Sequence, residues 1–138
     1  MAPEKKLVSN NYLTNVDKYI KISKSKSELE RISEVKKKTG VFTGLYAVNQ
    51  LNKYRMPIWV SDFALMSVGT GAIVGVPGHD LRDYDFAKQF KLPVIRVVVG
   101  SNGDKLPIVR REQVQEEEGK LINSEFLNEE DIHEAIKL

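Results

Sequence analysis

The chain has 138 residues, 41% of them hydrophobic, and is therefore long enough for one domain with a buried core. It contains no cysteine, which excludes disulfides, thiolate zinc sites and cysteine nucleophiles. The net charge is only +2, so any basic surface for nucleic acid must be local rather than spread over the whole chain.

Membrane insertion and secretion are not expected. The sequence has no apolar stretch long enough to span a membrane, and its first residues, MAPEKKLVSNN, lack the apolar core of a signal peptide. Together with the absence of cysteine, this predicts a protein of the reducing cytoplasm with no membrane partner.

The first third of the sequence is predicted to be helical. Apolar residues recur at helical spacing in two runs, Leu13–Val16–Ile20 and Leu29–Ile32–Val35. The polar stretch SKSKS at residues 23–27 predicts a break between them, and Ser27 with Glu30 fits a capping box for the second helix. Gly40 is expected to end the helical region in the left-handed conformation that suits a helix terminus.

This helical region is also the most basic part of the chain. Residues 17–38 contain eight Lys or Arg against four Asp or Glu and end in Lys36, Lys37 and Lys38. The run is typical of a solvated helix face, but it also fits a surface that contacts phosphates. Charge alone does not separate these two interpretations.

From residue 40 onwards the pattern changes to that of strands. Residues 41–49 and 56–66 are rich in β-branched and aromatic side chains and are joined by the polar connector QLNKYR. Residues 69–77, GTGAIVGVP, continue in a strand-like pattern. A helix is then predicted from His79 to Phe90, with four candidate buried residues: Tyr84, Phe86, Ala87 and Phe90.

The last third alternates strands and turns before a final helix. Residues 92–100, LPVIRVVVG, give the strongest strand signal, a turn follows at 101–107, and Pro107–Arg110 is expected to form a short strand. The C-terminal helix is predicted to have Asn128 as its N-cap, with acidic residues 129–131 in its first turn. We therefore expect residues 1–138 to form a single α+β domain around a mostly antiparallel sheet or small barrel.

The glycine-rich run at residues 69–78 admits two interpretations. A phosphate-binding loop would be followed directly by a helix, but strand-like residues follow Gly71, and no Gly-Lys-Ser/Thr ending is present. The alternative is a strand whose glycines allow close approach of its backbone, either by a substrate or by another strand.

The stretch HDLRDYDF at residues 79–86 concentrates polar groups. A metal site is disfavoured because the only other histidine, His133, is distant in sequence and three aspartates at 80, 83 and 85 cannot share one helix face. Asp80 as N-cap with Asp83 at the third helical position would satisfy free backbone N–H groups. A carboxylate held ionised there also suits recognition of an ammonium group, and Arg82 can pair with a carboxylate or phosphate.

No nucleophile is evident. The sequence has no Gly-x-Ser-x-Gly elbow and no pairing of a nucleophile with a base. If the protein catalyses hydrolysis, a positioned water is favoured over a covalent intermediate.

Several segments resemble the editing domain of leucyl-tRNA synthetases, also called connective peptide 1. They are APEKKLV, KTGVFTGLYAVN, MPIWVSDFALM, GTGAIVGVPGHDLRDYDFAKQFKLPV and EEGKLINSEFL, and together they cover almost the whole chain. The run from the GTG to the RD motif is the most specific of them. The resemblance implies a small β-barrel-like fold with flanking helices.

The resemblance also implies a function. Editing domains hydrolyse the ester of tRNA(Leu) charged with the wrong amino acid, because one hydrophobic pocket separates similar side chains by only about 1–3 kcal/mol. By resemblance, Asp83 binds the α-amino group, and Asp83, Asp80 and Arg82 are the candidate catalytic residues. Val74, Gly75, Val76 and His79 are the other candidate substrate-binding residues, and Lys36, Lys37 and Lys38 are candidates for tRNA binding. The partners implied are the tRNA(Leu) 3′ end and the remainder of the synthetase; no metal or cofactor is expected.

Two departures from the family qualify this expectation. The threonine-rich segment that excludes leucine lies upstream of the family's APE motif, and here that motif begins at Ala2, so we expect only part of the editing domain. Val68 stands where many relatives carry an aromatic residue. The alternative is therefore a catalytically incomplete module of the same fold that binds tRNA or protein.

Overall fold

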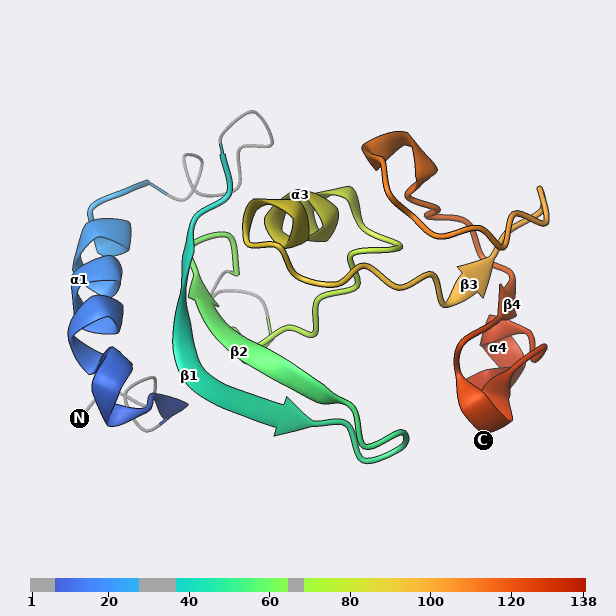
Figure 1. Ribbon diagram of the computed structural model, residues 1–138, viewed down its shortest axis with the longest axis horizontal. Helices are drawn as coiled ribbons and strands as arrows, with labels where there is room; N and C mark the ends of the chain where they lie inside the picture. Colours follow the sequence, from blue (N-terminus) through green and yellow to red (C-terminus); the bar gives the residue numbers. More distant parts are fainter. Residues whose placement is uncertain (1–6, 28–36, 65–68) are drawn as a thin grey trace. The chain divides into compact units, whose positions relative to one another are not determined.

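The computed structural model describes residues 7–27, 37–64 and 69–138. It divides into two compact units, Met1–Ile73 and Val74–Leu138, which are described separately below (Figure 1). Among the described residues, no helix is both long and apolar enough to cross a membrane. The second predicted helix, with its capping box, falls on residues 28–36 and, like Val68, lies outside the described part.

The first unit begins with a helix that follows the predicted periodicity. A 3₁₀ turn, η2 (Asn10–Tyr12), leads into α1 (Leu13–Lys24), which buries Val16 as expected. The helix stops within the SKSKS stretch, where the backbone N–H of Ser25 donates to the carbonyls of Ile22 and Ser23. The predicted end of the first helix within this stretch is confirmed.

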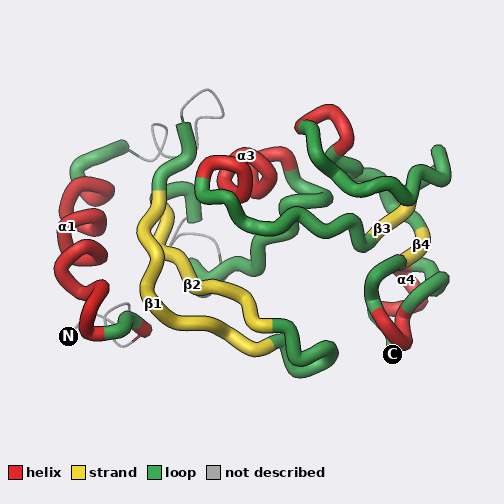
Figure 2. Tube along the Cα trace, in the orientation of Figure 1, coloured by secondary structure: helices red, strands yellow, loops and turns green. Residues whose placement is uncertain are grey.

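A β-hairpin makes up the rest of the first unit. Strand β1 (Gly40–Val48) pairs antiparallel with β2 (Arg55–Ser61), side by side in Figure 2, with Val41 opposite Val60 and Ala47 opposite Met56. The two predicted strands are confirmed, although β2 ends at Ser61. The expectation for Gly40 is wrong: it is the first residue of β1, and its φ is not among the positive ones.

A bulge in the hairpin is built around Gly44. The register shifts between Phe42 and Tyr46, and Gly44 has a φ of +79°, which favours glycine. A Cβ on Gly44 would lie 2.5 Å from the Tyr12 ring, so the absence of a side chain lets Tyr12 pack onto the strand. The Phe42 ring lies with its centroid 5.5 Å from those of Tyr12, Tyr46 and Trp59, which joins η2 to both strands.

The second unit has short elements linked by long loops. They are α3 (Leu81–Gln89), β3 (Val98–Val99), η3 (Arg111–Gln113), β4 (Lys120–Leu121), η4 (Glu125–Leu127) and α4 (Ile132–Ala135). Helix α3 confirms the predicted helix and buries Tyr84, Phe86 and Ala87, whereas the fourth candidate, Phe90, is its C-cap and only half-buried. Strands β3 and β4 pair antiparallel, Val98 with Leu121 and Val99 with Lys120.

Three predicted strands in this unit are wrong or much shorter than expected. Residues 72–76 and Pro107–Arg110 are irregular, and only Val98–Val99 of residues 92–100 form a strand. In each of the three stretches, side chains accept hydrogen bonds from one or two of the backbone N–H groups. The acceptors are Asp83 for Val76, His79 for Val97 and Val98, and Gln113 for Val109 and Arg110.

The C-terminal helix begins later than predicted. Its N-cap is Asp131, whose side chain accepts a hydrogen bond from the His133 N–H, and not Asn128. Asn128 instead accepts from the backbone N–H of Ser124 at 2.8 Å, and Glu129 has a φ of 68°, which interrupts any helix there.

The α+β class and the antiparallel pairing are confirmed. In the ranges that the structure describes, the strands form two separate two-stranded sheets and do not close into a barrel. The core of the second unit consists of the buried face of α3 together with Val98, Val99 and Ile108.

Candidate functional site at the start of helix α3

The N-terminus of α3 is capped as the sequence predicts. Asp80 Oδ1 accepts hydrogen bonds from the backbone N–H groups of Arg82 at 2.8 Å and Asp83 at 3.1 Å. Asp80 Oδ2 forms an ion pair with the Arg82 guanidinium at 3.2 Å. Partial burial raises the pKa of Asp80, but hydrogen bonds from the Arg82 side chain and from both N–H groups, with the Arg82 charge, outweigh burial and lower this pKa overall. Asp80 and Arg82 thus form one charged pair at the helix start.

Asp83 ties the helix to the preceding loop. Its Oδ2 accepts the backbone N–H of Val76 at 2.8 Å, although the two residues are seven positions apart. Gly75 lies over the same carboxylate, because a Cβ placed on Gly75 would be 3.8 Å from Asp83 Oδ2. The structure therefore brings together predicted site residues from the glycine-rich run and from the helix.

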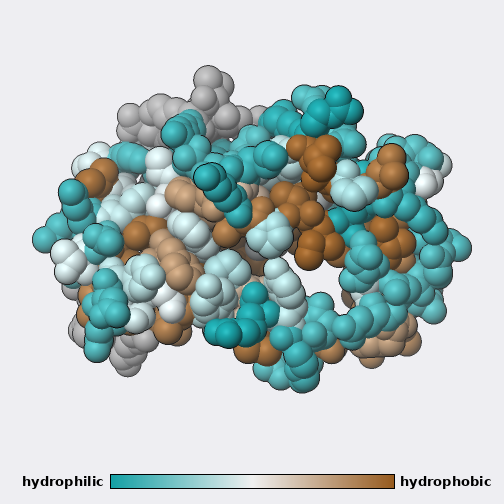
Figure 3. Space-filling model, in the orientation of Figure 1, coloured by the Kyte–Doolittle hydropathy of each residue, from teal (hydrophilic) through white to brown (hydrophobic). Residues whose placement is uncertain are grey.

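The loop whose backbone donates to this carboxylate exposes apolar side chains. Val74 is 70% exposed and Val76 46% exposed, and both lie in the irregular stretch before the helix. Apolar groups interrupt the hydrophilic surface at several places on the face shown in Figure 3. An anionic group beside exposed valines is an arrangement that can contact a molecule with an ammonium group and an aliphatic side chain.

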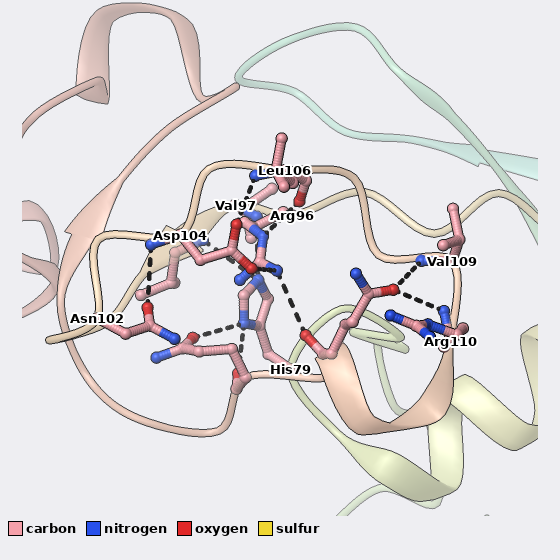
Figure 4. Close-up of polar contacts among 11 residues, drawn as sticks. His79, Arg96, Val97, Asn102, Asp104, Leu106, Val109 and Arg110 are labelled. Carbon is pink, nitrogen blue, oxygen red and sulfur yellow. Dashed lines mark hydrogen bonds and ion pairs between the residues drawn. The ribbon is translucent and has the colours of Figure 1, made fainter.

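His79 is occupied by contacts within the protein. Its Nε2 accepts the backbone N–H groups of Val97 at 3.0 Å and Val98 at 3.2 Å, and Nδ1 lies 2.7 Å from the backbone carbonyl of Gln115 (Figure 4). An Nε2 that accepts hydrogen bonds carries no proton, so Nδ1 carries one and donates it to Gln115. His79 thus joins the loop before α3 to strand β3.

At Gly78, the close approach expected for the glycine-rich run is observed. A Cβ on this buried residue would lie 2.5 Å from the Ile95 carbonyl oxygen, so the close approach at Gly78 is made by the protein's own backbone. Gly75, in contrast, has only the Asp83 carboxylate within 4 Å of its added Cβ.

Sequence reasoning missed the residues that support the site. The Arg96 side chain is 2% exposed and donates to Asp104 at 2.9 Å, the Leu106 carbonyl at 2.8 Å and the Gln113 carbonyl at 3.4 Å (Figure 4). Gln115 is also buried. An arginine inside the apolar run LPVIRVVVG was a usable signal, since arginine is rarely buried unless it is paired. Gln115 lies in the mostly polar stretch REQVQEEEG and gave no such signal.

A concave feature is lined by other residues than the valines and Asp83. It is a polar pocket of about 260 Å³ formed by side chains around Arg96; its other lining residues are Asn102, Asp104, Glu112, Gln113, Val114, Gln115, Glu116 and Glu117. Within the described residues, no three His, Asp or Glu side chains come together as a metal-binding group.

The candidate tRNA-binding lysines differ in exposure. Lys36 lies outside the described residues, and Lys37 is exposed. Lys38 is only 7% exposed, and its Nζ lies 5.5 Å from the centroid of the Phe63 ring. The Lys38 side chain is therefore part of the interior of the first unit.

The sequence and fold together define an editing domain of an aminoacyl-tRNA synthetase. The family model described as "Leucyl-tRNA synthetase, editing domain" matches residues 1–138, and the chain belongs to this family. It is 46% identical to a leucine–tRNA ligase of Mycoplasma capricolum subsp. capricolum, over all of this chain and 17% of that protein. It thus spans about a sixth of the length of this relative.

A solved structure has a similar fold. It is the ternary complex of Agrobacterium radiobacter K84 agnB2 LeuRS with tRNA and LeuAMS, which matches with a TM-score of 0.54 and 41% identity. The match covers 70% of this chain and 12% of that one.

Proposed function

We propose that this chain is the part of a leucyl-tRNA synthetase that hydrolyses the ester of tRNA(Leu) carrying a noncognate amino acid. Residues 1–138 act together as one editing domain, with the remainder of the synthetase as partner. The observation that carries the proposal is the Asp83 carboxylate, held 2.8 Å from the Val76 N–H and next to exposed valines. It occupies the first turn of α3, where the helix dipole favours negative charge.

In this proposal each residue of the site has its own role in recognition. Asp83 binds the α-ammonium group of the amino acid through a charge-assisted hydrogen bond. Val74 and Val76 contact its aliphatic side chain, while Asp80 and Arg82 hold the helix start and its charges in place. Water attacks the ester carbonyl, positioned by backbone groups of Gly75–Gly78 and a ribose hydroxyl of the tRNA, and the products are the free amino acid and tRNA. Neither a metal nor a dissociable cofactor is needed for this reaction.

We also propose that the first unit contacts the tRNA phosphates. Lys18, Lys21 and Lys24 are exposed along α1 at a spacing of three residues, which places neighbours on the same side of the helix. The Tyr19 hydroxyl lies 2.8 Å from Thr39 Oγ1, so the segment that follows exposed Lys37 contacts the same helix. Lys18, Lys21, Lys24 and Lys37 form this basic surface in the proposal, Lys36 remains a candidate from the sequence, and Lys38 is buried.

The direct test is hydrolysis of isoleucine- and leucine-charged tRNA(Leu) by the chain. We expect selective loss of the isoleucine ester. Asp83→Asn retains an oxygen that can accept the Val76 N–H but removes the charge, so kcat/KM should fall about 10- to 100-fold. Asp83→Ala should be lower still, because it also releases Val76.

Asp85→Asn is the matched control. Asp85 lies on the same helix and pairs with Arg111 at 3.1 Å, away from Val76. It should hydrolyse the ester at the rate of the unaltered chain. If the folded chain binds tRNA(Leu) but hydrolyses neither ester, the chain is a binding module, and the proposed function is wrong for this chain on its own.

A further inference from the structure

We infer that His79 is a positioning residue for the proposed hydrolysis, acting through the loop Val76–Asp83 and not through contact with the substrate. The expected effect of His79 on catalysis rests on the proposed function, whereas the contacts of His79 are observed independently of it. Both ring nitrogens of His79 are engaged by backbone groups of distant segments. A histidine acting as general base would have to give up one of these contacts.

A continuous series of hydrogen bonds leads from His79 to the carboxylate of Asp83. The backbone N–H of His79 donates to the Val76 carbonyl at 2.8 Å, and the Asp80 N–H donates to the same oxygen at 3.0 Å. The Val76 N–H in turn donates to Asp83 Oδ2. The position of the His79 backbone therefore determines where Val76 lies relative to Asp83.

The other end of the series is anchored in the interior of the second unit. The Gln115 N–H donates to the Gly78 carbonyl at 3.1 Å, while the Gln115 carbonyl accepts from His79. Arg96 precedes Val97 and donates to the Gln113 carbonyl, so a closed ring of contacts runs through His79, Gln115, Gln113 and Arg96 (Figure 4). Because Arg96 is buried and has three acceptors, this ring gives the imidazole a fixed frame.

Two variants each retain the hydrogen bonds of one ring nitrogen of His79 and lose those of the other. The amide nitrogen of His79→Asn can replace Nδ1 and donate to Gln115, whereas the amide oxygen of His79→Gln can replace Nε2 and accept from Val97 and Val98. Each retains one contact, and His79→Ala retains neither. We expect kcat to fall about tenfold for Asn and Gln and about 100-fold for Ala, since small displacements of positioning groups have effects of this size.

His133→Gln is the matched control, because His133 is exposed and contacts only Glu118 and its own helix start among the contacts that the structure gives it. It should leave kcat and KM unchanged. A graded loss of kcat in folded His79 variants supports the positioning role. A lower melting temperature with kcat and KM unchanged overturns it, as does a change confined to KM, which is expected of a direct substrate contact.

A second measurement separates this inference from the proposed function. Amide hydrogen exchange at Val76 reports its bond to Asp83 and requires no activity. In His79→Ala we expect the Val76 amide to exchange about tenfold faster, as expected for a locally loosened loop. Unchanged exchange at Val76 overturns the positioning role, whereas faster exchange in a chain that hydrolyses no ester supports the loop contact and rejects only the proposed reaction.

Discussion

The two units satisfy their backbone groups in different ways. In the first, β1 and β2 pair with each other over most of their length, so backbone accepts from backbone. In the second, side chains replace the missing strand partner at three places: Asp83, His79 and Gln113 accept N–H groups from residues distant along the chain or across a turn. Only two residues in each of its strands form a ladder.

This difference has a consequence for function. A backbone ladder tolerates many side chains, because the hydrogen bonds do not depend on them. A loop held by side chains depends on the identity of each one, and here the same loop carries the candidate site. Substitutions in the second unit should therefore affect folding and site geometry together, whereas those in the hairpin should affect folding alone.

The largest effect is expected for Arg96→Ala. This change leaves Asp104 without its cation and two carbonyl groups, of Leu106 and Gln113, without their donor. We expect the free energy of unfolding to fall by about 3 kcal/mol, measured by urea denaturation. Because the ring around His79 is broken as well, amide exchange at Val97 should accelerate.

Arg111→Ala is the comparison for this prediction. Its ion pair with Asp85 has a length of 3.1 Å, but the Arg111 side chain is 48% exposed. Exposed pairs contribute about 0–1 kcal/mol, so the variant should be close to the unaltered chain. Equal effects of the two substitutions would contradict the role given to buried side-chain contacts in this unit.

In the hairpin, the expected weak point is a glycine and not a polar side chain. Gly44→Ala places a Cβ against the Tyr12 ring at a φ of +79°, so strain and overlap add. We expect a loss of about 2 kcal/mol, measured by the same denaturation. Ester hydrolysis by the folded fraction should not change, because the residues nearest to an added Cβ, Tyr12 and Ser9, are not candidate site residues.

Gly103→Ala separates the two causes. Gly103 has a φ of +67° but nothing within 4 Å of an added Cβ, so only the backbone strain remains, about 1 kcal/mol. A Gly44→Ala variant that is no less stable than Gly103→Ala would show that Tyr12 moves aside without cost, and that the aromatic packing does not hold the bulge.

The same difference explains what could be predicted from the sequence. The hairpin and α1 depend on local propensity and periodicity, which a single sequence displays, and both are confirmed. The Asp80 cap is confirmed too, because a cap is decided by residues three positions apart. In the second unit, apolar runs correctly indicated buried segments such as Val98–Val99, but their partners are side chains from elsewhere in the chain.

The support of the candidate site belongs to this second category. Gln115 contributes through its backbone carbonyl and N–H, and its side-chain Oε1 also lies 3.2 Å from His79 Nδ1. No side-chain pattern can reveal the backbone contacts. His79 matched a motif, so its presence at the site was predicted, but its partners are 18, 19 and 36 residues away. Contacts of this range depend on the tertiary fold, and local pattern gives no register for them.

A smaller effect than that of Gly44→Ala is expected at Asp80, which combines a cap with a charge. Asp80→Ala should lower the free energy of unfolding by about 1 kcal/mol, because two N–H groups of the first turn lose their acceptor. Asp80→Asn retains a capping oxygen and removes only the charge, so it isolates the electrostatic part. The two variants should therefore differ from the unaltered chain by different amounts at neutral pH.

The pH dependence of the Asp80→Asn comparison has a definite sign. The folded-state pKa of Asp80 lies below the ordinary value of 3.8, so the folded protein binds fewer protons at this group than the unfolded chain does. The charge then stabilises the fold fully above pH 3.8, and this stabilisation is lost as the pH falls through the lowered pKa. Below pH 3.8, unfolding curves of the unaltered chain should approach those of Asp80→Asn. If the gap between the two stays constant with pH, the carboxylate acts only as a cap, and the Arg82 pair does not stabilise its charge.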